Sequence, residues 1–284
     1  WTNMLSKNSL QFWLYSIKEK VITKAIFIQF LVYLYHIAGL IVCLYSPTDL
    51  HRSLFIEHHF SHIHFIILII VALIFYNLTC QGPGFVTYDS TPFIQDDYTS
   101  HCSICRINQP LRSTHCKKCG RCVIRRDHHC PWLGTCVGRQ NHFFFVVYLF
   151  FDTIVFFLFV KQTYPLTKLN NSNFFVWLMT SFLGAVLCFF GVFGFLQTIC
   201  LLPFHIFLIL TNKTTWESLK STSIPYMKDW TSSISPFSQG LFQNIREFVT
   251  MRWNHPTYQF PSGARYEKWK KDNSFLVNDS YECC

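Results

Sequence analysis

Residues 100 to 142 read SHCSICRINQPLRSTHCKKCGRCVIRRDHHCPWLGTCVGRQNH, and this stretch holds seven of the thirteen cysteines in the 284-residue chain. Cys102 with Cys105 and Cys116 with Cys119 each form a Cys-x-x-Cys knuckle, which can supply two thiolates to one tetrahedral zinc ion. Two knuckles indicate two zinc ions. Cysteines at this spacing also favour a reducing compartment over a disulfide framework.

Each of the two ions needs two more ligands, and more candidates are present than are needed. Six lie nearby: His115, Cys122, His128, His129, Cys130 and Cys136. Structural zinc sites are closed and saturated, so one Cys and one His outside them are free for chemistry. The alternative is that this spare pair has no role beyond structure.

The segment RRDHHCPW at 125–132 contains the residue types of an acid–base–nucleophile triad. Cys130 offers a thiol that reacts as the thiolate, and His128 offers an imidazole to take its proton. Asp127 offers a carboxylate that can fix the tautomer and orientation of that imidazole. The sequence therefore predicts Cys130 as a nucleophile for acyl exchange between thiols.

Long apolar blocks fill most of the remaining chain. Hydrophobic residues make up 50% of it, 31 residues are Phe and only 14% are charged, a composition typical of membrane proteins. The blocks are about 18 residues or longer, the length that crosses a hydrocarbon core about 30 Å thick. We expect an α-helical polytopic membrane protein with four transmembrane helices, at 25–45, 62–79, 143–160 and 175–210.

Three features of these blocks concern the structure of the spans. The block at 175–210 is longer than one perpendicular helix needs, yet two spans would leave almost no turn, so we expect one helix, tilted and broken at Pro203 or preceded by an interfacial segment. Asp152 lies near the middle of the third span, where an ionisable group is costly and is expected to be paired or to face a polar interior. Small residues of the last span are expected to allow close helix approach: Gly184, Gly191 and Gly194.

The positions of the cations predict the orientation. The formal net charge is +9, and Lys and Arg gather in 1–24, in the 100–142 segment and in 211–284. By the positive-inside rule these three parts are cytosolic, which places the zinc domain between the second and third helices on the cytosolic side. Because the cations flank apolar blocks, membrane headgroups are favoured over nucleic acid as their partner. No cleavable signal peptide is expected, since the first block lacks a small-residue cleavage site.

With these residues in place, the segment resembles the cysteine-rich domain of the DHHC palmitoyltransferases. The pattern from Cys102 to Cys136 matches that family at every metal and catalytic position. The resemblance implies that one zinc ion is held by Cys102, Cys105, His115 and Cys122, and the other by Cys116, Cys119, His129 and Cys136. It also implies Cys130 as the acylated nucleophile, His128 as the general base and Asp127 as the residue that orients it.

The resemblance extends beyond this domain. Thr214-Thr215-Trp216-Glu217 matches the family's TTxE motif, and the segment from Pro236-Phe237 through Asn244 to Phe248 resembles its C-terminal aromatic and Asn motif. One departure is that Gly82-Pro83-Gly84 stands where the family has Asp-Pro-Gly. The layout is most similar to the short Golgi and endoplasmic reticulum members.

The resemblance implies a protein S-acyltransferase that works by a ping-pong route. A long-chain acyl group, such as palmitoyl, would pass from acyl-CoA to Cys130 and then to cysteine thiols of membrane-associated proteins. Attraction of the CoA phosphates by charge is one interpretation of five cations, and attraction to lipid headgroups is the other. These cations are Arg106, Arg112, Lys117, Arg125 and Arg126.

Two other function classes compete with the enzyme. A membrane adaptor could use the zinc domain as a protein-binding module without catalysis. A transporter is suggested only by the spans and Asp152, and four spans without an internal repeat argue against it.

Overall fold

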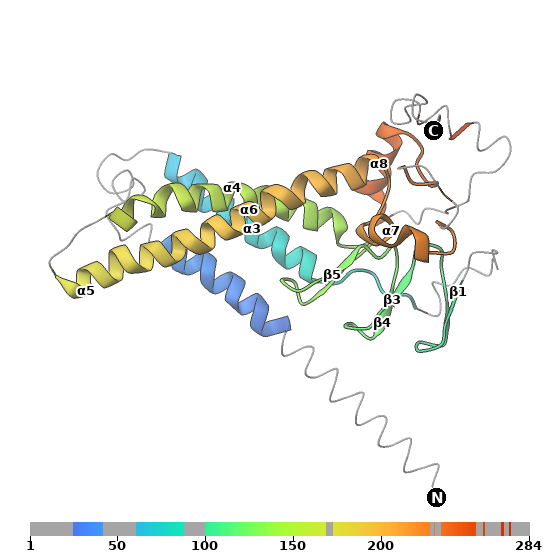
Figure 1. The fold of residues 1–284 in the computed structure, drawn as a ribbon, viewed down its shortest axis with the longest axis horizontal. Coiled ribbons are helices and arrows are strands. Elements are labelled where there is room, and N and C mark those ends of the chain that lie inside the picture. The colour runs from blue at the N-terminus through green and yellow to red at the C-terminus, as the bar shows by residue number, and fades with distance from the viewer. Residues whose placement is uncertain are drawn as a thin grey trace, which may run out of the picture. The chain divides into compact units, whose positions relative to one another are not determined.

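The computed structural model describes residues 25–41, 61–87, 100–168, 173–227, 230, 234–253, 258, 268–269 and 273 (Figure 1). The chain divides into two compact units. The helical unit comprises Ile26–Leu78 and Phe144–Pro203, and the hairpin unit comprises Trp1–Ala25, Thr79–Phe143 and Phe204–Cys284. The predicted N-terminal segment 1–24 and much of the tail beyond residue 253 lie outside the described residues.

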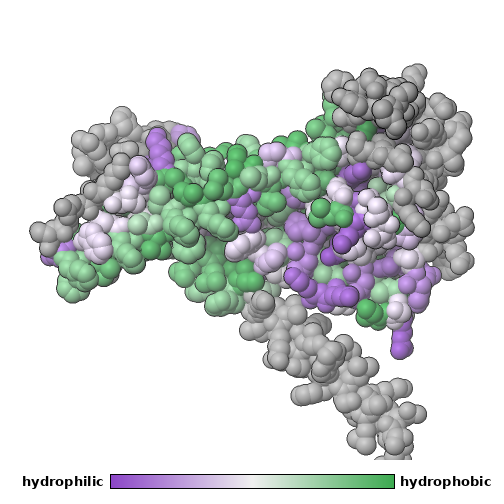
Figure 2. Space-filling model, in the orientation of Figure 1, coloured by the Kyte–Doolittle hydropathy of each residue, from purple (hydrophilic) through white to green (hydrophobic). Residues whose placement is uncertain are grey.

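The helices of the chain include two that are long and apolar enough to cross a membrane. By length and composition these are His142–Thr167 and α6 (Leu183–Leu210). The first contains α4 (His142–Thr163) and most of the short η3 (Pro165–Lys168). Two shorter apolar helices, Ala25–Ile41 and His64–Cys80, overlap the first two predicted spans; the second is part of α3 (Ser61–Cys80). In Figure 2 the visible surface over the helices is mainly hydrophobic.

The predicted last span contains an interruption, although not at the proline. Helix α5 (Phe174–Trp177) passes into a π-helical turn, η4 (Leu178–Phe182), and then into α6. Pro203 lies inside α6, and the helix continues through it to Leu210. The expected break at Pro203 is therefore wrong, and the irregular turn lies about six helical turns before Pro203.

The core of the helical unit forms where α3 meets α4. Phe65, Ile69 and Ala72 of α3 recur at helical spacing and pack against Val155 and Phe159 of α4. Helix α6 approaches α4 closely through glycine, as expected. A Cβ atom at Gly194 would lie 2.5 Å from Cζ of Phe156, so only hydrogen fits between the two helices there.

Asp152 has a partner in this unit. Its Oδ1 lies 3.0 Å from Nε2 of His36, and the two side chains are 2% and 1% exposed. The other ring nitrogen of His36 lies 2.8 Å from the Val32 carbonyl oxygen. The pair joins helix Ala25–Ile41 to α4. It gives the carboxylate of Asp152, which lies within a predicted span, the polar partner that such a buried group requires.

The zinc-domain sequence folds into three antiparallel hairpins, each made of two three-residue strands. The pairs are β1 (Ser100–Cys102) with β2 (Ile107–Gln109), β3 (Thr114–Cys116) with β4 (Arg121–Val123), and β5 (His128–Cys130) with β6 (Thr135–Val137). In Figure 2 their visible surface is largely hydrophilic.

The loop after α3 joins the hairpins by main-chain hydrogen bonds. Ile124 N donates to Gly84 O at 2.9 Å, and Val86 N donates to Cys122 O at 2.9 Å. Gly82 has φ +135°, a conformation that disfavours any residue with a Cβ. The turn is thus built on glycine at the position where the family has Asp.

In the described part of the chain, short helices follow α6 in the hairpin unit. They include α7 (Thr215–Lys220), the 3-10 turn η5 (Ser221–Ser223) and α8 (Leu241–Thr250). Helix α7 begins with a capping box, in which the Thr214 hydroxyl accepts from Glu217 N and the Glu217 carboxylate accepts from Thr214 N.

Candidate active site and zinc centres

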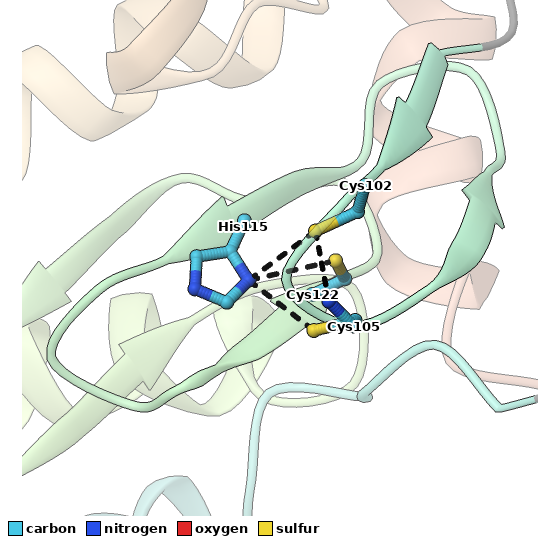
Figure 3. A group of neighbouring side chains, drawn as sticks. All are labelled: Cys102, Cys105, His115 and Cys122. Carbon is cyan, nitrogen blue, oxygen red and sulfur yellow. Dashed lines mark hydrogen bonds between the residues drawn. The ribbon is translucent and has the colours of Figure 1, made fainter.

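The first predicted set of zinc ligands converges on a small volume. Nδ1 of His115 lies 3.6 Å, 3.3 Å and 3.8 Å from the sulfur atoms of Cys102, Cys105 and Cys122 (Figure 3). Figure 3 shows the three sulfurs turned toward this ring nitrogen. All four ligand atoms lie within 4.8 Å of one another.

The second predicted set has the same geometry. Nδ1 of His129 lies 3.7 Å, 3.3 Å and 3.7 Å from the sulfurs of Cys116, Cys119 and Cys136. Tetrahedral zinc with Zn–S of about 2.3 Å and Zn–N of about 2.0 Å separates its ligand atoms by roughly 3.5–3.8 Å. The distances in both clusters therefore fit a zinc ion.

The hairpin register explains why the two sites interleave. His115 faces Cys122 across the second hairpin, and His129 faces Cys136 across the third. Each such pair completes the knuckle of the preceding hairpin, so each ion would tie one hairpin to the next. The second ion would therefore fix the third hairpin, which carries Cys130, through His129 and Cys136.

Strand β5 carries the candidate catalytic residues on one face and a predicted zinc ligand on the other. Side chains of a strand alternate between its two faces, so His128 and Cys130 share the face opposite His129. Cys130 is 5% exposed and is a hydrogen-bond partner of His128. The same imidazole also contacts Asp127: Nδ1 of His128 lies 2.7 Å from Oδ2 of the carboxylate. The predicted Asp, His and Cys are thus connected in series.

The environment of His128 favours its protonated form. Burial alone would lower the pKa of the imidazole, but its hydrogen bonds to Asp127 and Cys130 raise that pKa to about 9. A cationic imidazole beside a thiol stabilises the thiolate.

Asp127 is fully buried and held from both sides. Thr215 donates to Oδ1 from its main-chain nitrogen at 2.8 Å and to Oδ2 from its hydroxyl at 2.7 Å. Trp216 N donates to the main-chain oxygen of Asp127 at 3.1 Å. Burial would raise the pKa of the carboxyl, yet the neighbouring imidazoles of His142 and His128 hold that pKa well below its usual value.

Two buried histidines lie behind Asp127. Nε2 of His142 lies 3.1 Å from Nδ1 of His205 and 3.9 Å from Oδ1 of Asp127. These three side chains form a third group with ligand atoms within 4.8 Å. Because both oxygens of Asp127 already accept hydrogen bonds and the two imidazoles are hydrogen-bonded to each other, we interpret the group as a buried polar support for the carboxylate.

A buried polar network connects the hairpins to the TTxE motif. Arg112 donates to both carboxylate oxygens of Glu217, from Nε at 2.7 Å and Nη2 at 2.8 Å. It also donates to the Asn212 side chain at 3.0 Å, and Arg125 donates to the same oxygen at 2.9 Å. Glu217 in turn caps α7, the helix that presents Thr215 to Asp127.

This network changes the interpretation of the five candidate CoA-binding cations. Arg112 and Arg125 are 3% and 2% exposed and have protein partners, so they are not placed to meet a phosphate from solvent. Arg126 is half-buried, with its guanidinium 4.7 Å from the centre of the Trp216 ring. Arg106 and Lys117 are exposed and remain candidates.

Comparison with known proteins agrees with this geometry. Residues 95–222 match the family model of the DHHC palmitoyltransferases. The chain is also 31% identical over 225 residues to human palmitoyltransferase ZDHHC12, covering 73% of this chain and 78% of that protein. The chain belongs to the DHHC family.

Two further relatives match over shorter stretches. A ZDHHC-type protein of Dictyostelium discoideum is 33% identical over 96 residues, 32% of this chain. Protein S-acyltransferase 10 of Arabidopsis thaliana is 37% identical over 51 residues, 18% of this chain. The matches cover only 22% and 15% of the lengths of these two relatives.

Sequence reasoning missed three of the residues around Asp127. The Thr214–Glu217 motif was noted, but not that Thr215 holds the carboxylate. His142 and His205 lie near the ends of predicted spans, among apolar residues. An ionisable residue is rare in such a segment, and this rarity could have indicated a functional role for both histidines.

Proposed function

We propose that this DHHC protein is a protein S-acyltransferase that uses Cys130 as its nucleophile. The observation that carries the proposal is the arrangement of β5, which places Cys130 and His128 on one face and a zinc ligand on the other. The hydrogen bonds that join Cys130, His128 and Asp127 then supply a nucleophile, a proton carrier and an orienting carboxylate.

The reaction has two balanced steps. The Cys130 thiolate attacks the thioester carbonyl of a long-chain acyl-CoA, a new C–S bond forms, and the bond to the CoA sulfur breaks. His128 gives its proton to the departing CoA thiolate. An acceptor cysteine then gives its proton to His128 and attacks the acyl-Cys130 thioester, which restores the Cys130 thiolate.

In this proposal the zinc ions are structural. Cys102, Cys105, His115 and Cys122 would hold one, and Cys116, Cys119, His129 and Cys136 the other. Saturated Cys₃His sites contribute folding free energy and leave no open position for substrate. The role of the zinc ions would be to keep the third hairpin, and with it Cys130, in position.

The direct test is acylation of the purified protein by a labelled palmitoyl-CoA. We expect a label that hydroxylamine releases, as it does thioesters, and that disappears in Cys130→Ala. A matched control is Cys200→Ala, since Cys200 is an exposed cysteine of α6. If the wild-type protein takes no hydroxylamine-sensitive label, the adaptor interpretation replaces the enzyme.

We further propose that four helices span the membrane, with the zinc domain and both tails cytosolic. The two long apolar helices support two spans, and Ala25–Ile41 with α3 would supply the others. The acceptors would be proteins with membrane-proximal cysteines, and the likeness to short family members favours the Golgi or endoplasmic reticulum membrane. Protease treatment of sealed microsomes should cleave both tails; a protected carboxyl end would contradict this topology.

A further inference from the structure

The two buried histidines behind Asp127 differ in their contacts. His142 is the first residue of α4, and His205 lies in the last two turns of α6. The ring centre of His205 lies 5.2 Å from that of His142 and 5.9 Å from that of His128. All four residues belong to the hairpin unit. His205 therefore contacts both the imidazole that partners Cys130 and the imidazole behind the Asp127 carboxylate.

The His142 imidazole is hydrogen-bonded to His205 and not to the carboxylate beside it. Nε2 of His142 lies 3.1 Å from Nδ1 of His205 but 3.9 Å from Oδ1 of Asp127, which is beyond hydrogen-bonding distance. Oδ1 instead accepts from Thr215 N at 2.8 Å. Oδ2 accepts from the Thr215 hydroxyl and lies 2.7 Å from Nδ1 of His128. The carboxylate thus keeps its contact with His128 although a third imidazole is near.

The burial of His142 decides which histidine carries the proton between the two rings. Nδ1 of His142 is buried and has no hydrogen-bond partner among the residues that the structure describes. A proton on this nitrogen would be an unsatisfied buried donor, and the lone pair of Nε2 would then face the Asp127 carboxylate. Both costs are avoided when the proton is on Nε2. Nδ1 of His205 is then the acceptor of that proton.

The position of His205 in the sequence also indicates a role at the site. An ionisable side chain inside a long apolar helix is costly and is retained where a polar partner requires it. His205 is buried within α6, and its neighbours Phe204 and Ile206 are apolar. Packing of this helix needs no imidazole, so the contacts of His205 with His142 and His128 account for the residue.

We propose that His205 is a positioning residue of the active site, because its Nδ1 holds the His142 N–H away from Asp127. Without this acceptor, the N–H of His142 turns to the nearest anion, Oδ1 of Asp127. A further donor on the carboxylate draws its charge away and weakens its hydrogen bond to His128. The inference rests on the proposed roles of His128 and Cys130 in acyl transfer.

Two polar substitutions test the acceptor atom itself. In His205→Asn the amide group lies near the position of Nδ1, whereas in His205→Gln it lies one carbon further from the main chain, near that of Nε2. We expect the rate of Cys130 acylation by labelled palmitoyl-CoA to stay within about threefold of wild type in His205→Asn and to fall about tenfold in His205→Gln. The KM for palmitoyl-CoA should change less than about twofold in both, because substrate binding is not altered. Equal rates in the two variants would overturn the inference.

Removal of His142 distinguishes positioning from a general loss of packing. His205→Leu removes the acceptor, and its effect is measured in the wild-type protein and in His142→Phe, where the N–H is also absent. We expect His205→Leu to slow acylation about tenfold in the first background and less than about threefold in the second. Equal losses in both backgrounds, with both zinc ions retained, would show that His205 acts through packing alone. A wild-type protein that takes no label on Cys130 would refute the proposed function and, with it, the inference.

Discussion

Thr215 donates hydrogen bonds to both carboxylate oxygens of Asp127, at 2.8 Å from its main-chain nitrogen and at 2.7 Å from its hydroxyl. The two residues are 88 positions apart in the sequence. The start of α7 thus acts on the residue that orients His128, and the TTxE motif has a specific place in the site.

Loss of the Thr215 hydroxyl should reduce acyl transfer. Thr215→Val keeps the shape of the side chain but removes one hydrogen bond to a buried carboxylate, a contribution of about 1.5–3 kcal/mol. We expect the rate of Cys130 acylation to fall about 10- to 100-fold. Thr215→Ser retains the hydroxyl and should stay within about threefold of wild type. Equal losses in the two variants would show that the hydroxyl is not the group that matters.

The Arg112–Glu217 pair should make stability depend on acid. Burial would raise the pKa of Glu217, but the charge of Arg112 and its hydrogen bonds lower that pKa below the usual value. The group therefore stabilises the fold above the unfolded pKa of about 4.5, and this contribution is lost as the pH falls through the lowered folded value.

Removing Arg112 isolates the carboxylate in the interior. Arg112→Ala should cost about 3–5 kcal/mol at neutral pH, measured by thermal unfolding in detergent. Glu217→Gln should weaken the dependence of the melting temperature on pH below about 4.5, with the remainder set by other carboxylates of lowered pKa such as Asp127. An unchanged acid profile in that variant would refute the assignment.

Zinc content should distinguish ligands from the nucleophile. Cys102→Ala removes a ligand from the first cluster, so the protein should lose about one zinc ion per chain and its stability should fall. Cys130→Ala touches neither cluster and should retain both ions, measured by plasma emission spectroscopy on purified protein. Equal metal loss in the two variants would mean that the ligand sets are wrong.

A double-mutant cycle should reveal the coupling of His36 and Asp152 within the helical unit. Each single change to Leu leaves a buried polar partner and should cost about 3–5 kcal/mol. Replacing both together should cost markedly less than the sum, because no group is left unpaired. Strictly additive losses in melting experiments would contradict a direct pair.

Local chemistry made the zinc residues predictable, whereas distant contacts were not. The two knuckles and the other predicted His and Cys ligands lie within 35 positions of the chain. Their spacing can therefore be read directly from the sequence. The strands of the hairpins are three residues long, too short to show a period of two, so the alternation of His128, His129 and Cys130 became visible only in the structure.

Contacts between remote segments left no sequence signal of their own. His36 lies 116 positions from Asp152, and Arg112 lies 105 positions from Glu217. Charge counting therefore left Arg112 with two candidate partners, the CoA phosphates and the lipid headgroups. Nothing near Arg112 in the sequence predicts its buried ion pair with a carboxylate more than 100 residues away. The apolar blocks, in contrast, overlap the long helices α4 and α6, because length and hydropathy are properties of the local sequence.

Acyl transfer through Cys130 is most directly tested by peptide mass spectrometry of a single turnover. The purified protein is mixed with palmitoyl-CoA, quenched and digested, and a second sample is chased with an acceptor cysteine peptide before quenching. We predict a palmitoyl adduct on Cys130 in the first sample and its transfer to the peptide in the second. An adduct on another cysteine with Cys130 unmodified, or acylated peptide formed at the wild-type rate by Cys130→Ala, would contradict the account.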